Sequence, residues 1–190
     1  MPKLKNPYND LPSPIKSVYR KFKACTRCPL HTTKCNYVFY RGEAPCDILF
    51  IGEAPGRNED KSGSPFVGRS GDLLEALIED VKNQSVDFEY GITNIVSCIP
   101  LDEEGKIRQP NKEEADACRE RFLMTLEKSA PKAIVLLGKV AKKYFKQPKE
   151  STQPVLELAH PAYILRKGGK NSLEYAKNVL YLRDFITAHG

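Results

Sequence analysis

The sequence predicts an α/β fold, a three-layer αβα sandwich with a central four-stranded, mainly parallel sheet and helices on both faces. Four short, largely apolar runs, at residues 47–51, 90–99, 132–137 and 154–159, have the pattern of strands. Of these, 47–51 and 132–137 have the pattern of strands that are buried on both faces of a parallel sheet. Segments with apolar residues at helical spacing alternate with these runs. A length of 190 residues and a hydrophobic content of 41% are typical of one domain with a substantial core, so we expect residues 1–190 to form a single domain.

Charge and composition narrow the class of protein. Thirty Lys and Arg against 24 Asp and Glu give a net charge of +6, which permits a polyanionic partner such as nucleic acid. The chain has neither an apolar run of about eighteen residues nor an apolar N-terminal leader, so we expect a cytoplasmic protein without a membrane partner. In a reducing compartment, its six cysteines are more plausible as metal ligands than as disulfides.

The N-terminal region divides into a tail and a helix. Residues 1–12 contain three prolines and no periodic pattern, so we expect a loosely ordered tail. A helix then begins at Ser13-Pro14, because proline is favoured in the first turn, and apolar residues from Ile15 to Phe22 follow at helical spacing.

Two cysteines separated by two residues, Cys25 and Cys28, follow this helix. Such a turn brings both thiolates to the same side, where they can bind one metal ion or one edge of a cluster. Two more ligands are needed, and spacing alone leaves both a zinc ion and an iron-sulfur cluster open. The chain offers Cys35, Cys46, Cys98 and Cys118.

The stretch 47–71 has the pattern of a strand, a loop and a helix. Directly after the strand, Gly52-Glu53-Ala54-Pro55-Gly56 makes a rigid turn at a strand's carboxyl end, where open α/β sheets bind their ligands. A second glycine-rich loop, 63–68, carries Phe66 outside any periodic core pattern. It precedes a helix that Ser70 can cap.

A phosphate loop and an ordinary tight turn are alternative interpretations of this stretch. A phosphate loop needs glycine immediately before its Lys-Ser pair, so that backbone amides can wrap the phosphates. Here Asp60 precedes Lys61-Ser62, and its carboxylate would lie where phosphate oxygens should. The pattern therefore argues against a nucleotide site, whereas the tight turn stays open.

The later strands carry polar residues at their ends. Asn94 interrupts the apolar run 90–99, and an amide in a buried strand is costly unless it is hydrogen-bonded. His160 directly follows the run 154–159. Because the carboxyl ends of parallel strands lie at one edge of a sheet, we expect Glu53, Asn94 and His160 to converge there.

Two helices are also clear from their caps. Asn111 and Glu114 form a capping box, and the helix that follows carries Cys118 on its apolar face. Ser172 precedes the final helix, 173–188. Residues of this helix that are available for packing are Leu173, Ala176, Leu180 and Phe185. Basic residues after His160, which we expect to contact phosphates if the partner is a nucleic acid such as DNA, are Arg166, Lys167 and Lys170.

Four elements in order resemble one known family. They are the Cys-x-x-Cys pair, GEAPG followed by GSPFVGRSG, Thr93-Asn94 followed by Cys98 and Cys118, and HPAYILR from His160. Together they are similar to the motifs of the family 4 uracil-DNA glycosylases, the iron-sulfur members of the uracil-DNA glycosylase superfamily. The superfamily's typical His-Pro-Ser has Ala162 in place of the serine here, which removes a hydroxyl that could bind a DNA phosphate.

The resemblance implies a DNA repair enzyme that flips uracil out of single- or double-stranded DNA and hydrolyses its N-glycosidic bond. It implies a structural [4Fe-4S] cluster on Cys25, Cys28, Cys98 and Cys118. It assigns catalysis to Glu53 and His160, although Glu59 is an alternative to Glu53. The implied base-binding residues are Glu53, Ala54, Phe66, Asn94 and His160.

The protein is expected to act as a monomer. Two other functions remain open. One is a DNA-binding relative that acts on a different modified base or has lost catalysis. The other is a small iron-sulfur redox or interaction protein, which would not need Phe66, Asn94 and His160 together.

Overall fold

A computed structural model describes residues 8–84 and 86–190. Residues 1–7, which belong to the expected tail, lie outside the described residues. The rest of that tail is attached to the protein, contrary to the prediction. Leu11 is buried, the ring of Tyr8 stacks on that of Tyr19 with centroids 4.2 Å apart, and the Tyr8 hydroxyl donates to the Tyr37 carbonyl at 2.9 Å.

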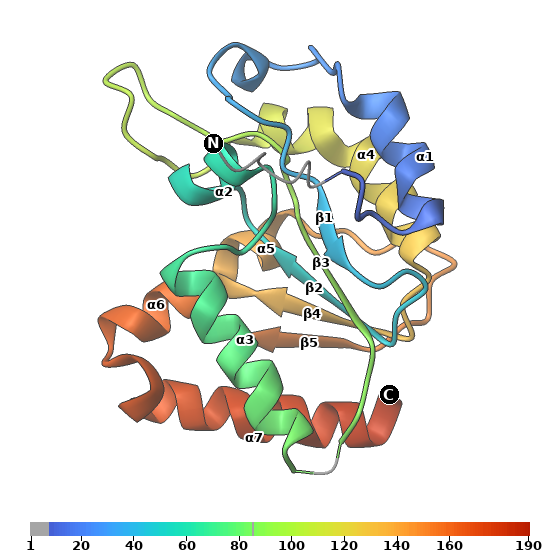
Figure 1. Ribbon diagram of the computed structural model, residues 1–190, viewed down its shortest axis with the longest axis vertical. Coiled ribbons are helices and arrows are strands. Elements are labelled where there is room, and N and C mark those ends of the chain that lie inside the picture. The colour runs from blue at the N-terminus through green and yellow to red at the C-terminus, as the bar shows by residue number, and fades with distance from the viewer. Residues whose placement is uncertain (1–7, 85) are drawn as a thin grey trace.

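A five-stranded sheet in the order β1-β3-β2-β4-β5 forms the middle layer (Figure 1). The predicted parallel strands are present as β2 (Ile48–Gly52), β3 (Tyr90–Asn94), β4 (Ala133–Leu137) and β5 (Val155–Leu158). The additional strand, β1 (Tyr40–Gly42), pairs antiparallel with β3 at the edge. Its sequence, YRG, has no apolar alternation, so only its pairing with β3 identifies it as a strand.

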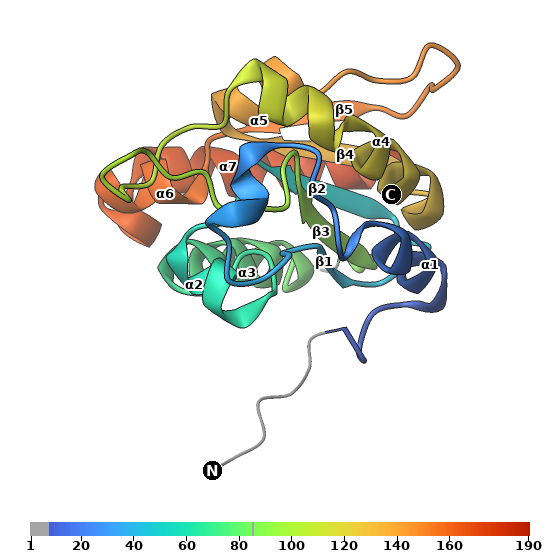
Figure 2. The ribbon, with the colours of Figure 1, turned by 90° about the horizontal axis from the view of Figure 1, so that it is seen from above.

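Helices cover both faces of the sheet, as predicted (Figures 1 and 2). Residues of β2 alternate between the two cores: Leu49 and Ile51 face one, and Ile48 and Phe50 face the other. The first face is covered by α1 (Ser13–Phe22), α4 (Lys112–Ser129) and α5 (Gly138–Tyr144), and the second by α3 (Arg69–Lys82), α6 (Pro161–Arg166) and α7 (Leu173–His189). The remaining short elements are η1 (Pro29–Thr32), α2 (Arg57–Ser62) and η2 (Gly169–Asn171).

Two details of the helices differ from the predictions. Helix α3 begins at Arg69 with Gly68 at its cap, so Ser70 lies inside the first turn. Of the α7 residues that we expected to pack, Phe185 packs against the core, whereas Leu173 and Leu180 are 65% and 43% exposed. The buried residues are Tyr175, Asn178, Leu182 and Ile186.

Polar contacts determine which face of α7 is buried. The Asn178 side chain accepts a hydrogen bond from the Ala159 N–H at 3.2 Å and donates to the Ala159 carbonyl at 3.0 Å. The Tyr175 hydroxyl donates to Asp80 on α3 at 2.6 Å. These bonds hold α7 against β5 and α3.

Across the described ranges, no helix combines the length and the apolar character that crossing a membrane requires.

Candidate active site

The carboxyl ends of β2, β3 and β5 bring the predicted site residues together. Glu53 directly follows β2, Asn94 is the last residue of β3, and the β2–β3 register pairs Gly52 with Asn94. With His160 after β5, these side chains line a cavity of about 470 Å³. Ala54 and Phe66 line the same cavity, so the structure places all five expected base-binding residues around one space.

Phe66 is held in an unusual backbone conformation. Its φ of 53° lies in the left-handed region, which bulky residues rarely adopt without support from their surroundings. The Arg41 side chain supplies that support by donating to the Pro65 carbonyl at 2.7 Å and to the Phe66 carbonyl at 3.0 Å. Arg41 lies on β1, the strand that the sequence did not reveal, so sequence analysis missed this residue.

Two glycines make room for Phe66. A Cβ on Gly71 would lie 1.8 Å from the Phe66 carbonyl oxygen, so this close approach requires glycine. A Cβ on Gly52 would lie 2.4 Å from Asn94 Oδ1 and 2.5 Å from the Phe66 ring. Glycine at position 52 therefore lets the amide and the aromatic ring meet at one wall of the cavity.

Asn94 carries an unpaired acceptor. Its side chain is buried, and its Oδ1 atom has no hydrogen-bond partner among the described residues. An unsatisfied buried acceptor costs about 1–3 kcal/mol, so it calls for an explanation. Because Asn94 lines the cavity, a ligand that donates a hydrogen bond there would satisfy it.

Arg121 positions Asn94 through hydrogen bonds to the backbone. This fully buried residue of α4 donates from Nη2 to the Asn94 carbonyl at 2.8 Å and to the Ile95 carbonyl at 2.6 Å. Its Nη1 atom lies 3.2 Å from Thr93 Oγ1. The guanidinium thus holds the last turn of chain after β3. Nothing in the helical pattern around Arg121 indicated this role, because the contacts join residues far apart in the sequence.

The surroundings of His160 determine its tautomer. Its Nδ1 atom accepts a hydrogen bond from the Ala162 backbone N–H at 3.1 Å, so the proton of the neutral ring resides on Nε2. Burial, together with the nearby positive charge of Arg166, lowers the pKa of His160 from 6.5 to about 4. The ring is therefore neutral at pH 7 and can donate from Nε2. It packs beside Phe66, with the ring centroids 5.8 Å apart.

The two candidate carboxylates have different partners. Burial raises the pKa of both Glu53 and Glu59 above the usual value for a carboxyl group. Glu59 Oε2 accepts a hydrogen bond from the Gly56 N–H at 3.0 Å, which closes the first turn of α2. Glu53 forms no side-chain hydrogen bond within the described ranges and lines the cavity, so its carboxylate is free to act on a ligand.

The loop 100–110 forms another wall. Arg108 makes a bidentate ion pair with buried Glu114, at 2.9 and 2.6 Å, and donates to the Leu101 carbonyl at 3.1 Å. The Arg108 guanidinium holds the pKa of Glu114 below its usual value. Arg108 and the 52% exposed Ile107 both line the cavity.

The four expected cluster ligands lie together on one side of the sheet. Cys25 and Cys28 pack against the same core as the buried Cys98 and Cys118. Burial, with a smaller contribution from the thiols of Cys118, Cys28 and Cys25, raises the pKa of Cys98 to about 12, so these three thiols lie within electrostatic range of Cys98. Among the described residues, no three His, Cys, Asp or Glu side chains are arranged to hold a metal ion. The set of four thiol donors fits an iron-sulfur cluster in its chemistry.

The other two cysteines have different neighbours, although Cys46 belongs to the same core. Cys35 is exposed, and its backbone N–H donates to Asp60 at 3.0 Å. The Cys46 sulfur lies 3.9 Å from the Tyr40 hydroxyl oxygen and 3.6 Å from the Ser129 carbonyl oxygen. The charged groups that shift the pKa of Cys98 include Cys118, Cys28 and Cys25 but neither Cys35 nor Cys46.

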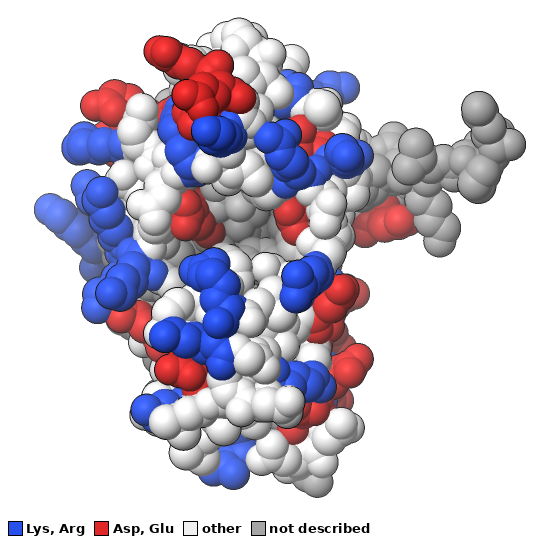
Figure 3. Space-filling model, turned by 90° about the vertical axis from the view of Figure 1, so that its left-hand side faces the viewer, with Lys and Arg blue, Asp and Glu red and all other residues white. Residues whose placement is uncertain are grey.

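The basic residues after His160 do not line the cavity. Lys170 lies 3.7 Å from an Asp80 oxygen, and the Lys167 ammonium lies over the Tyr163 ring, 5.7 Å from its centroid. Arg166 is exposed and close enough to His160 to affect its pKa. Figure 3 shows Lys and Arg side chains on both sides of a hollow that crosses this end of the molecule.

Comparison with known proteins reveals one family. Residues 39–183 match the family model described as the uracil DNA glycosylase superfamily. The Type-4 uracil-DNA glycosylase of Thermotoga maritima is 36% identical over 163 residues, 78% of this chain and 82% of that protein. The Type-4 enzyme of Archaeoglobus fulgidus is 37% identical over 130 residues, 68% of this chain. That match spans 62% of the length of the Archaeoglobus protein.

Proposed function

We propose that this chain, which belongs to the uracil-DNA glycosylase superfamily, removes uracil from DNA by hydrolysing the N-glycosidic bond and leaves an abasic site. The observation that carries the proposal is the unpaired Oδ1 of buried Asn94 in a cavity that also holds Phe66 and His160. We further propose that it acts as a single domain and a monomer in the reducing interior of a cell. Uracil in single- or double-stranded DNA is the substrate.

Base recognition would use Phe66 and Asn94. A flipped uracil can lie against the Phe66 ring, while Asn94 Oδ1 accepts from the N3–H group and the amide nitrogen donates to O4. Cytosine presents the opposite donor and acceptor pattern at these two positions. A mispaired buried amide costs about 1–3 kcal/mol, which is enough to discriminate between the two bases.

Bond cleavage would use His160 and Glu53. Departure of the base leaves negative charge on the uracil ring and positive charge on the sugar. The neutral His160 ring can donate from Nε2 to uracil O2, where negative charge develops. The free carboxylate of Glu53 can stabilise the positively charged sugar and orient the attacking water. Glu59 is less suitable because its carboxylate already binds the Gly56 N–H.

A [4Fe-4S] cluster would be held by Cys25, Cys28, Cys98 and Cys118. When bound, it supplies iron–thiolate bonds that cross-link the N-terminal segment, the chain after β3 and helix α4. None of these thiols lines the active-site cavity, so the role of the cluster is structural.

The protein purified without oxygen should therefore contain iron and sulfide and absorb in the thiolate-to-iron charge-transfer region. Cys98→Ala should lose the cluster, because a ligand is missing. Cys46→Ala is the matched control: it removes another buried thiol and should retain the iron. Stoichiometric zinc without iron in the parent protein would contradict the assignment.

Arg166, Lys167 and Lys170 would contact DNA phosphates beside the site. Replacing all three by alanine should weaken binding to any DNA sequence. It should also reduce the salt dependence of binding, because the variant neutralises fewer phosphates and its binding therefore releases fewer counterions from the DNA. Lys170 should contribute least, since Asp80 already lies 3.7 Å from its ammonium. Binding titrations at several salt concentrations measure this. An unchanged affinity and salt slope would leave these residues as solvated surface only.

The proposed activity is tested on a labelled oligonucleotide with one uracil. Incubation with the protein followed by alkali should break the strand at that position, because an abasic site is alkali-labile and uracil is not. A U·G mispair should react at least as readily as U·A, since a mispaired base is easier to extrude. No cleavage of single- or double-stranded substrate by protein with its cluster intact would refute uracil removal, and other modified bases would then be screened.

A further inference from the structure

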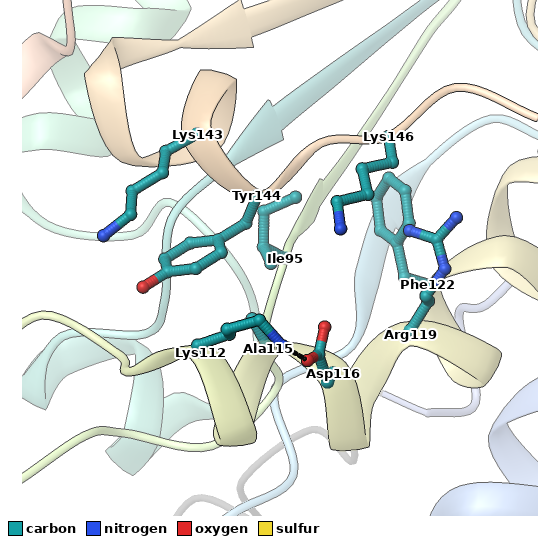
Figure 4. A pocket seen from close by; sticks show the side chains of 9 residues that line it. All are labelled: Ile95, Lys112, Ala115, Asp116, Arg119, Phe122, Lys143, Tyr144 and Lys146. Atoms are coloured by element: carbon teal, nitrogen blue, oxygen red, sulfur yellow. Dashed lines mark hydrogen bonds and ion pairs between the residues drawn. The ribbon is translucent and has the colours of Figure 1, made fainter.

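A second cavity, of about 260 Å³, lies between α4 and the end of α5 and shares no lining residue with the active site (Figure 4). Part of its lining is apolar and aromatic. Ile95, Ala115 and Phe122 contribute buried surface, and the half-buried Tyr144 presents its ring to the space. Such a surface suits a flat, apolar group.

The charged residues of this cavity are mostly cations. Lys112, Arg119, Lys143 and Lys146 line it together with a single carboxylate, that of Asp116. Asp116 is already paired with Lys112 at 2.5 Å. Arg119, Lys143 and Lys146 form no ion pair within the part of the chain that the structure describes. An anionic ligand would find unpaired positive charge here beside an aromatic ring.

One short segment separates this cavity from the active site. Arg108 lines the active site, the carbonyl of Pro110 accepts a hydrogen bond from the Tyr144 hydroxyl at 3.2 Å, and Lys112 lines the second cavity. The chain after β3 also separates the two cavities, because Asn94 lines the active site and the next residue, Ile95, lines the second cavity. A strand bound in the active site therefore has the second cavity as a close neighbour.

We propose that the second cavity binds an unpaired nucleotide of the DNA strand that carries the uracil, with its base against Tyr144 and its phosphates beside Arg119, Lys143 and Lys146. Cationic grooves with aromatic side chains bind single-stranded DNA without sequence preference, because every base has a flat face. Only an unpaired base can stack there, so the site favours single-stranded substrate. The choice of DNA as the ligand rests on the proposed function.

The test uses a uracil-free, single-stranded oligonucleotide, so that binding is measured whether or not the protein removes uracil. Tyr144→Ala should weaken binding about 5- to 150-fold, the effect expected for the loss of one base–aromatic contact. Tyr144→Phe keeps the ring and should bind within about twofold of the parent. The thermal stability and iron content of both variants are measured first, and binding is compared only if they equal those of the parent protein.

A second measurement tests the cations. Replacing Arg119 and Lys146 together by alanine should lower the salt slope of single-strand binding by about 0.7 for each lost phosphate contact. Lys16→Ala with Lys177→Ala is the control. It removes the same net charge from the half-buried Lys16 of α1 and the exposed Lys177 of α7, neither of which lines the cavity, and should leave the slope nearly unchanged.

The outcomes are distinguishable. If Tyr144→Ala binds DNA as the parent does, base stacking in this cavity is wrong. If the Arg119 and Lys146 double variant has the salt slope of its control, the phosphate contacts are wrong. Binding of an acidic, phenylalanine-containing peptide that is sensitive to Tyr144→Ala, with DNA binding insensitive to it, would assign the cavity to a protein partner instead. A protein that leaves uracil in place but meets both DNA-binding expectations would refute only the proposed function.

Discussion

Replacing His160 by alanine should slow uracil release on the order of 10²-fold or more while DNA binding stays nearly intact. The reason is that the Nε2 proton, whose position follows from the hydrogen bond between Nδ1 and the Ala162 N–H, acts mainly on the departing anion. Single-turnover rates on a uracil oligonucleotide measure the chemical step separately from binding. The matched control is His189→Ala, which removes an exposed histidine at the end of α7. Full activity without His160 would refute this mechanism.

The pH dependence gives a second check on the same residue. With a pKa of about 4 in place of 6.5, His160 stays neutral as the pH falls through 6.5, so the rate should not drop there. Folding stability should respond differently. The unfolded chain binds a proton below pH 6.5 that the folded chain does not, so stability decreases as the pH falls from 6.5 toward 4. His160→Ala should reduce that decrease. A rate that falls as the pH drops through about 6.5 would show that the ring titrates there and is not shifted by burial, and a rate that rises would show that the protonated ring is the active form.

Asn94→Asp should weaken the discrimination between uracil and cytosine. A carboxylate accepts a hydrogen bond from the exocyclic amine of cytosine but cannot donate to O4 of uracil. Loss of that pairing should slow uracil removal about 5- to 150-fold, which corresponds to about 1–3 kcal/mol. The Arg121 guanidinium binds the backbone carbonyl of residue 94 at 2.8 Å, so the substitution leaves this contact in place.

Parallel assays on uracil and cytosine oligonucleotides measure the ratio of the two base-removal rates, which is the discrimination between the bases. Asn83→Asp is the control, since it makes the same chemical change at an exposed position at the end of α3. Retention of the parent preference for uracil in Asn94→Asp would show that another group reads the base.

Local sequence patterns predicted most of the fold. The apolar runs around β2, β3 and β4 leave a clear signal because these strands are buried on both faces. The run around β5 was also predicted, although β5 lies at the edge of the sheet and Glu157 is exposed. The capping box of Asn111 and Glu114 is present at the start of α4 for a similar reason, since capping depends on neighbours only three residues apart. The edge strand β1 left no such signal, because its three residues become a strand only by pairing with β3.

The sequence by itself determined that Glu53, Asn94 and His160 lie at one rim, because each follows a strand of a parallel sheet. Only the tertiary structure decided how they are held. Arg41 fixes the Phe66 loop, Arg121 fixes the end of β3, and Asn178 selects the buried face of α7. These three contacts are hydrogen bonds between polar groups that are 19 to 27 residues apart in the chain. Bonds of this kind have no period and no fixed spacing, so they become visible only when the chain is folded.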